Sequence, residues 1–143
     1  MIQLILHLIG DYVTQSDWMA QNKVKRSWPA LCHVVVYSLP FLFLTQSPVA
    51  LTMICGTHFL IDRFRLARYV VWLKNVFLSP ALFWVIPRKV DREIGYPHEN
   101  LRWLNCSGTG YPSDAPPWLA VWLLIAADNT LHLAINYAAL RWL

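Results

Sequence analysis

The chain has 143 residues, of which 57% are hydrophobic and only 14% charged, and its formal net charge is +4. Because soluble globular domains carry roughly 25% charged residues, this composition predicts an integral membrane protein. The cations lie between the apolar stretches and form no basic stripe with a nucleic-acid-binding motif, which argues against a nucleic-acid partner. The three cysteines form no CxxC pair and are expected to be small buried residues without a disulfide framework: Cys32, Cys55 and Cys106.

The first predicted helix covers residues 2–22. Its polar residues recur at every fourth position and form one stripe, Gln3, His7, Asp11 and Gln15. The apolar part is too short to cross a bilayer core of ~30 Å alone, so this helix is either a half-span or a span whose polar face is covered by its neighbours. A second helix is predicted over 29–46, with a kink at Pro40.

The third predicted helix covers 49–74 and contains His58 and Asp62. Residues 76–86 are apolar but short, which favours an interfacial or re-entrant piece, and 87–115 form a polar connection. The last helix, 116–142, is apolar and long enough to span. The sequence therefore predicts an all-α protein, a single transmembrane domain over 1–143 built as a bundle of about four helices.

The distribution of cations predicts an orientation. Basic residues follow the first helix (Lys23, Lys25 and Arg26) and the apolar part of the third, whereas the connection after the second helix carries none. By the positive-inside rule the basic loops are cytoplasmic, and both termini then lie on the outer side. If residues 69–86 cross the membrane instead, the C-terminus lies on the cytoplasmic side.

Three acidic residues lie inside apolar stretches, and each is four positions from a histidine. The pairs are His7/Asp11, His58/Asp62 and Asp128/His132, and His33 lies in another apolar stretch. Positions i and i+4 share one face of a helix, so each pair can direct a ring nitrogen and a carboxylate oxygen at one point. Ionisable groups are costly in hydrocarbon unless they are satisfied, and a bound metal ion would satisfy all of them together.

Neutral imidazole nitrogen and carboxylate oxygen suit a divalent transition metal, zinc foremost, with iron, manganese and nickel as alternatives. The donors suffice for two ions, or for one ion with supporting partners. The candidate ligands are His7, Asp11, His33, His58, Asp62, Asp128 and His132. The carboxylates Asp11, Asp62 and Asp128 are also the candidate catalytic groups. In the alternative interpretation, histidines such as His33 only join helices by hydrogen bonds. His98, in the polar connection, is expected to be a solvated loop residue in either case.

The predicted depths of these groups agree only loosely. His33 and Asp62 lie near the cytoplasmic ends of their helices, whereas Asp128 lies about 12 residues, or ~18 Å, into the last helix. A water-filled funnel on the cytoplasmic side would let one site lie deep in the bundle.

The residues resemble a family of bacterial and phage membrane proteins known as domain of unknown function 3307. The resemblance is carried by HLIGDYVTQSDWMAQNK (7–23), His33 with Tyr37, THFLID (57–62) and DNTLH (128–132), and extends over nearly the whole chain. It implies a small multi-helix protein, in the inner membrane of a bacterium, whose polar positions match His7, Asp11, Gln15, Lys23, His33, His58, Asp62, Asp128 and His132. Relatives often have Asp-Gln where this chain has Asp128-Asn129, and the family supplies no activity.

Three functions remain open at this level. The first is an intramembrane metal-dependent hydrolase acting on a lipid or lipid-linked substrate. The second is a small membrane interaction protein, of a phage–host conflict or exclusion type, in which the His/Asp cluster is structural. The third is a metal or proton transporter, since intramembrane ionisable groups also mark ion pathways. The expected partners are the bilayer, a lipid-like substrate, and a second copy or another membrane protein.

Overall fold

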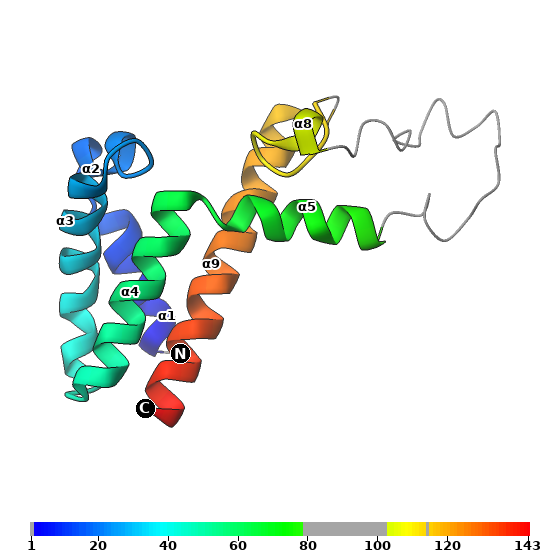
Figure 1. Ribbon diagram of the computed structural model, residues 1–143. Helices are drawn as coiled ribbons and strands as arrows, with labels where there is room; N and C mark the ends of the chain where they lie inside the picture. The colour runs from blue at the N-terminus through cyan, green and yellow to red at the C-terminus, as the bar shows by residue number, and fades with distance from the viewer. Residues whose placement is uncertain (1, 79–102, 114) are drawn as a thin grey trace, which may run out of the picture. The chain divides into compact units, whose positions relative to one another are not determined.

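The computed structural model describes residues 2–78, 103–113 and 115–143, and every regular element in these ranges is a helix (Figure 1). This confirms the all-α expectation for the described residues. They divide into two compact units, each considered by itself below. Unit 1 comprises Met1–Leu66 with Asp128–Leu143, and unit 2 comprises Ala67–Ala127.

Unit 1 begins with α1 (Ile2–Leu8), which continues directly as a π-helix, η1 (Ile9–Val13). The wider turn is closed by a 2.9 Å hydrogen bond from the Thr14 N–H to the Ile9 carbonyl, five residues back. Such π-helical turns inside helices occur frequently at functional sites.

The next helix, α2 (Asp17–Asn22), is separate from α1 and η1. Ser16 has extended backbone angles, and its hydroxyl accepts a 3.3 Å hydrogen bond from the Met19 N–H. An N-cap of this kind begins a helix and cannot lie in the middle of one. The segment expected as one helix over 2–22 is therefore interrupted before Asp17.

The α3 helix (Ser27–Ser38) changes at its end into a 3₁₀-helix, η2 (Leu39–Phe43). Pro40 lies at the start of η2, and because proline has no N–H it cannot continue the α-helical ladder. The kink expected at Pro40 thus takes the form of a change of helix type.

The α4 helix (Pro48–Phe64) ends at Arg65, whose backbone is left-handed with φ 52° and ψ 48°. A left-handed residue closes a helix, and here the Arg65 N–H donates to the Asp62 carbonyl over 3.3 Å. A separate helix, α5 (Ala67–Leu78), follows. The segment expected as one helix over 49–74 is thus two helices.

The last helix, α9 (Pro117–Trp142), has 26 residues and covers nearly the expected range. Among the described residues it is the one helix that is long and apolar enough to cross a membrane, by length and composition alone. Its residues 117–127 belong to unit 2, and its residues from Asp128 onward belong to unit 1.

In unit 1, α1, α3, α4 and the C-terminal part of α9 run alongside one another (Figure 1). An apolar cluster lies inside the bundle, formed by Tyr37, Phe41, Ile54 and Ala139. The other buried side chains of this unit include many polar ones: His7, Asp11, His33, Ser38, His58, Asp62, His132 and Asn136. Large apolar side chains such as Val35, Phe43 and Met53 are exposed instead. Unit 1 therefore buries polar side chains beside its apolar cluster and exposes large apolar ones.

Unit 2 contains α5, the short α8 (Trp103–Cys106) and a turn packed against α5. Gly110 in this turn has φ +81°, and a β-carbon there would overlap the Arg68 carbonyl. Of the expected interfacial segment 76–86, only the first three residues are described, as the end of α5. The rest of it, and His98, lie outside the described residues.

Candidate metal centre

Five buried His and Asp side chains from four elements of unit 1 converge. Asp11 comes from η1, His33 from α3, His58 and Asp62 from α4, and His132 from α9. The pair on α4 shares one face because its residues are four apart, and the neighbouring elements bring the other three residues toward that face. Residues that are up to 121 positions apart in the chain thus meet in one cluster.

The donor atoms of this cluster are closely and evenly spaced. The Nε2 atoms of His33 and His58 lie 3.0 Å apart. Each of these two atoms is 3.3 Å from Asp11 Oδ1 and 3.2 Å from Asp62 Oδ2. Asp62 Oδ1, the other oxygen of that carboxylate, lies 3.4 Å from His132 Nε2.

These spacings fit a metal ion. Zinc ligands lie ~2.0–2.2 Å from the ion, so two ligands of one tetrahedral ion are about 3.3 Å apart. Two groups among the described residues could hold an ion: Asp11, His33 and His58, and His58, Asp62 and His132. Asp11 Oδ1, a donor atom of the first group, is buried and makes no hydrogen bond within the described part of the chain. Buried polar atoms are normally satisfied, and a cation is a partner that this donor set could accommodate.

The two groups share His58, which limits how many ions fit. An imidazole nitrogen has one lone pair and binds one ion. The Nε2 atom of His58 contacts both Asp11 and Asp62, so through this atom the two groups cannot both be filled. The geometry therefore favours one ion over the two that the number of donors would allow.

A lysine also reaches the cluster. Lys23 Nζ lies 2.8 Å from Asp62 Oδ2 and 3.5 Å from His33 Nε2. With neutral imidazoles, the two buried carboxylates Asp11 and Asp62 together with this ammonium leave one negative charge at the cluster, which favours a cation there. The cation pattern placed Lys23 in a basic loop, and the family resemblance placed it among the family's polar positions. No local spacing could have linked it to Asp62, which is 39 residues away.

Two expected ligands lie at the edge of the cluster and belong to neither three-residue group. His7 is fully buried, but both of its ring nitrogens are hydrogen-bonded, Nδ1 to the Tyr37 hydroxyl (2.8 Å) and Nε2 to Asn129 Oδ1 (2.7 Å). His7 Nε2 is also 3.5 Å from Asp11 Oδ2. Asp128 Oδ2 is 3.6 Å from His132 Nε2, and the Asp128 side chain is 32% exposed. His7 is therefore placed to orient Asp11, whereas Asp128 is in contact with solvent.

Gly10 lets Asp11 come close to the histidines. A β-carbon at Gly10 would overlap Tyr37 Cδ2 on α3 and lie 3.0 Å from Tyr37 Cε2. Without a side chain at this position, η1 can approach α3 closely, and the neighbouring Asp11 reaches His33. The sequence shows the glycine but not this approach.

Aromatic packing holds the histidine rings in place. The ring centroids of Tyr37 and His58 are 3.7 Å apart, and those of His58 and His132 are 4.0 Å apart in a stacked arrangement. Close-packed rings have few alternative rotamers, so the ring nitrogens are directed at the cluster before any ion binds.

Together the fold and the site define a helical protein with a buried His/Asp cluster that could hold a metal ion. The chain belongs to the family described as protein of unknown function (DUF3307), whose sequence model matches residues 1–85. The matched range contains Asp11, His33, His58 and Asp62, whereas the DNTLH motif (128–132) lies beyond it. Neither a curated protein nor a solved structure matches the chain.

Proposed function

We propose that this chain is a membrane metalloprotein that binds one divalent transition metal ion, zinc foremost. Asp11, His33 and His58 hold the ion, and Asp62 lies beside both histidines with its second oxygen next to His132. The observation that carries this proposal is the set of donor–donor distances of 3.0–3.3 Å among nitrogen and oxygen atoms contributed by three elements. Buried ionisable groups are costly unless they are paired or bound to a metal ion.

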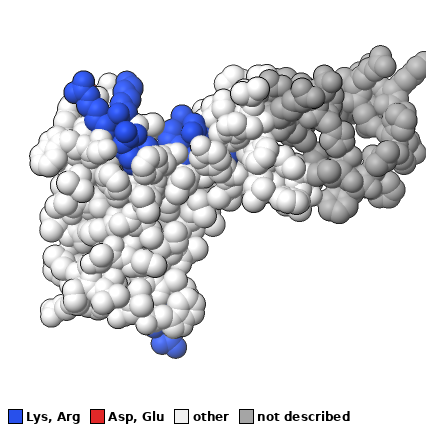
Figure 2. Space-filling model, viewed as in Figure 1, with Lys and Arg blue, Asp and Glu red and all other residues white. Residues whose placement is uncertain are grey.

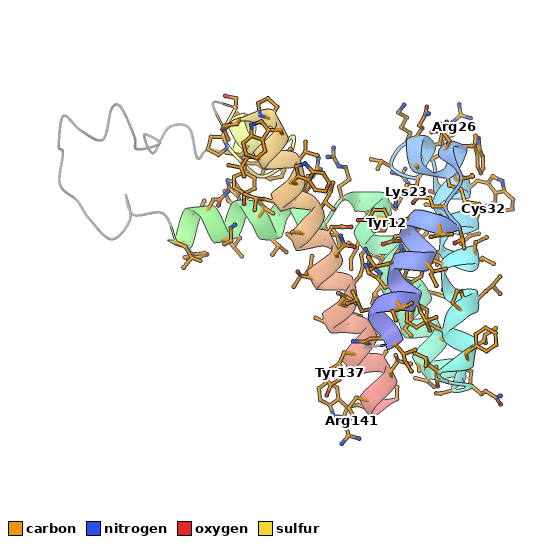
Figure 3. The ribbon with its side chains drawn as sticks, turned by 180° about the vertical axis from the view of Figure 1, so that it is seen from behind. Tyr12, Lys23, Arg26, Cys32, Tyr137 and Arg141 are labelled. Atoms are coloured by element: carbon orange, nitrogen blue, oxygen red, sulfur yellow. The ribbon has the colours of Figure 1, made fainter. Side chains whose placement is uncertain are left out.

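The surface of unit 1 supports a location in the membrane. In Figure 2, Lys and Arg side chains gather at the end of unit 1 that holds α2, and from there to the opposite end this face shows neither basic nor acidic groups. Arg141 lies at the opposite end (Figure 3). The α4 helix has 17 residues, or ~26 Å at ~1.5 Å per residue, comparable with a bilayer core of ~30 Å. The basic α2 end is placed on the cytoplasmic side, of the inner membrane in a bacterium, by the positive-inside rule.

The reaction we propose is hydrolysis of a lipid or lipid-linked ester. A divalent ion held by Asp11, His33 and His58 would polarise the ester and make water a better nucleophile. Asp128 is suited to act as the general base, because its carboxylate is partly exposed and lies next to His132 Nε2. His7 keeps the ligand Asp11 oriented through its 3.5 Å contact.

The first experiment measures metal content by mass spectrometry of protein purified in detergent. Wild type is expected to hold about one equivalent per chain, because one His58 nitrogen serves one ion. The double variant His33→Gln/His58→Gln should lose it while keeping a helical circular dichroism spectrum. Asp17→Asn is the matched control, since the Asp17 carboxylate is exposed and bonds Gln21 on its own helix. A metal-free wild type that is folded overturns the proposal.

A second experiment tests hydrolysis. Metal-loaded wild type is incubated with phospholipid extract, and the products are followed by mass spectrometry. Asp128→Asn should keep its metal and lower the rate about 10²–10⁴-fold, the usual contribution of a general base. If metal is bound and no product forms from any lipid class, the hydrolase is excluded, and the ion supports the bundle of an interaction protein.

A further inference from the structure

Lys23 follows α2 and extends its ammonium to the edge of the metal centre. It contacts Asp62 Oδ2 at 2.8 Å and His33 Nε2 at 3.5 Å. Its side chain is 19% exposed, whereas that of Asp62 is 4% exposed. Figure 3 shows Lys23 with Tyr12 toward the α2 end of unit 1, away from Tyr137 and Arg141. The ammonium therefore lies between the buried donors and the outside.

The hydrogen bonds of Lys23 leave capacity for an anion. An ammonium has three N–H donors, and Asp62 takes one. In the weaker contact, the ammonium donates to the lone pair on His33 Nε2, and the same lone pair would bind a metal ion instead. Once the ion is bound, at least two donors of Lys23 need another acceptor.

The charges of the buried groups specify what that acceptor is. Asp11 and Asp62 are almost fully buried, and with Lys23 and a divalent ion they sum to one positive charge. Asp128 is about one-third exposed, so water screens its charge much more strongly. A monoanion at the edge of the centre neutralises this remaining charge. Lysine ammonium groups bind phosphate oxygens well as point charges.

We propose that Lys23 and the bound ion together form a binding site for a phosphodiester monoanion, the chemistry of a phospholipid headgroup. This inference rests on the proposed metal centre and names the substrate class for it. The α2 end is suited to a headgroup, because Trp18 and Trp28 are exposed there. Tryptophan is enriched at the level of the headgroups in membrane proteins.

The experiment uses full-length protein loaded with Co²⁺ and follows ³¹P relaxation, so it needs no turnover. The probes are dimethyl phosphate, a phosphodiester monoanion, and trimethyl phosphate, a neutral analogue of similar shape. Wild type should enhance relaxation of the first and leave the second nearly unchanged. Lys23→Met should bind dimethyl phosphate about tenfold or more weakly at equal cobalt content, since a charge-assisted hydrogen bond is lost. Lys23→Arg should recover part of the affinity.

Two further samples complete the design. Lys25→Met is the matched control, because Lys25 is exposed and follows the same helix, and it should behave as wild type. Dihexanoyl phosphatidylglycerol, used below its micelle concentration, tests whether the site takes a lipid headgroup or any phosphodiester. Tighter binding than dimethyl phosphate indicates a lipid headgroup, and equal binding indicates recognition of the phosphodiester alone.

Other outcomes overturn the inference. If Lys23→Met binds dimethyl phosphate like wild type at equal cobalt content, Lys23 is not part of an anion site, and the metal centre itself stands. If trimethyl phosphate relaxes as strongly as dimethyl phosphate, the site does not select a monoanion. If folded wild type binds no cobalt, the proposed metal centre fails first. Cobalt content and the visible spectrum of each variant show whether its site is intact.

Discussion

Asn136 on α9 donates a 2.6 Å hydrogen bond to the hydroxyl of Tyr37 on α3, and both side chains are buried. Since the Tyr37 oxygen accepts from Asn136, its own proton is donated to His7 Nδ1 over 2.8 Å. His7 must then carry its proton on Nε2, which donates to Asn129 Oδ1. This directed chain keeps His7 neutral and explains why it suits a supporting role beside Asp11.

Removal of the Tyr37 hydroxyl should destabilise unit 1. Tyr37→Phe leaves His7 Nδ1 and Asn136 Nδ2 buried without a shared partner, which costs about 1–3 kcal/mol. Tyr12→Phe is the matched control: its hydroxyl also bonds an asparagine, Asn129, but lies on the exposed surface, so the cost should be below ~0.5 kcal/mol. Denaturant unfolding in detergent, followed by circular dichroism, measures both. Equal losses would contradict the directed chain.

His7 and His33 should respond differently to the same change. We expect His7→Gln to keep one equivalent of metal but bind it ~10–100-fold more weakly, the usual effect of losing a residue that orients a ligand. His33→Gln should abolish stoichiometric binding, because His33 Nε2 contacts both carboxylates. Competition with a chelator of known affinity measures both constants. Loss of binding in both variants would make His7 a ligand as well.

Two glycines offer a test of the close approach at η1. Gly10→Ala forces a β-carbon against the Tyr37 ring and should cost about 1–3 kcal/mol, as overpacking does in a tight core. It should also weaken metal binding, since η1 has to move and carries Asp11. Gly56→Ala meets nothing within 4 Å and lies inside α4, so it should stabilise the protein by ~0.5–1 kcal/mol. Thermal unfolding of the two variants measures these changes in stability. A Gly10→Ala variant as stable as wild type would contradict the close approach of η1 to α3.

Metal removal should lower stability in a way that depends on Asp11. An ion present at 100 times its dissociation constant stabilises the folded state by ~2.7 kcal/mol, so a chelator should lower the unfolding temperature of wild type. Asp11→Asn should show little change with chelator, whereas Asp17→Asn, altered at an exposed carboxylate, should respond as wild type does. A chelator effect that survives in Asp11→Asn would place the ion elsewhere.

Counted along their helices, the candidate ligands lie at different depths, and the structure explains how they still meet. Counted along the chain, Asp128 lies far into the last helix. In the structure, residues 117–127 of α9 belong to unit 2, and only the part from Asp128 onward enters the bundle. His132 therefore reaches Asp62, near the end of α4, and the water-filled funnel stays a prediction.

The sequence by itself determined the helical fold, the family and the helix face on which each His/Asp pair lies. His58/Asp62 and His7/Asp11 could be found because a helix repeats its contacts every four residues, and that rule is local. The helix ends were less predictable: the left-handed Arg65 and the π-helical turn at Asp11 follow from how neighbouring segments pack.

Only the tertiary structure decided which faces meet. The contact of His33 with His58 joins residues 25 apart, and that of Lys23 with Asp62 joins residues 39 apart. Periodicity fixes the direction of a side chain around its own helix, but the rotation and offset of one helix against another depend on packing, such as the approach at Gly10. For this reason the sequence could propose ligands, whereas the number of ions and the place of Lys23 required the assembled bundle.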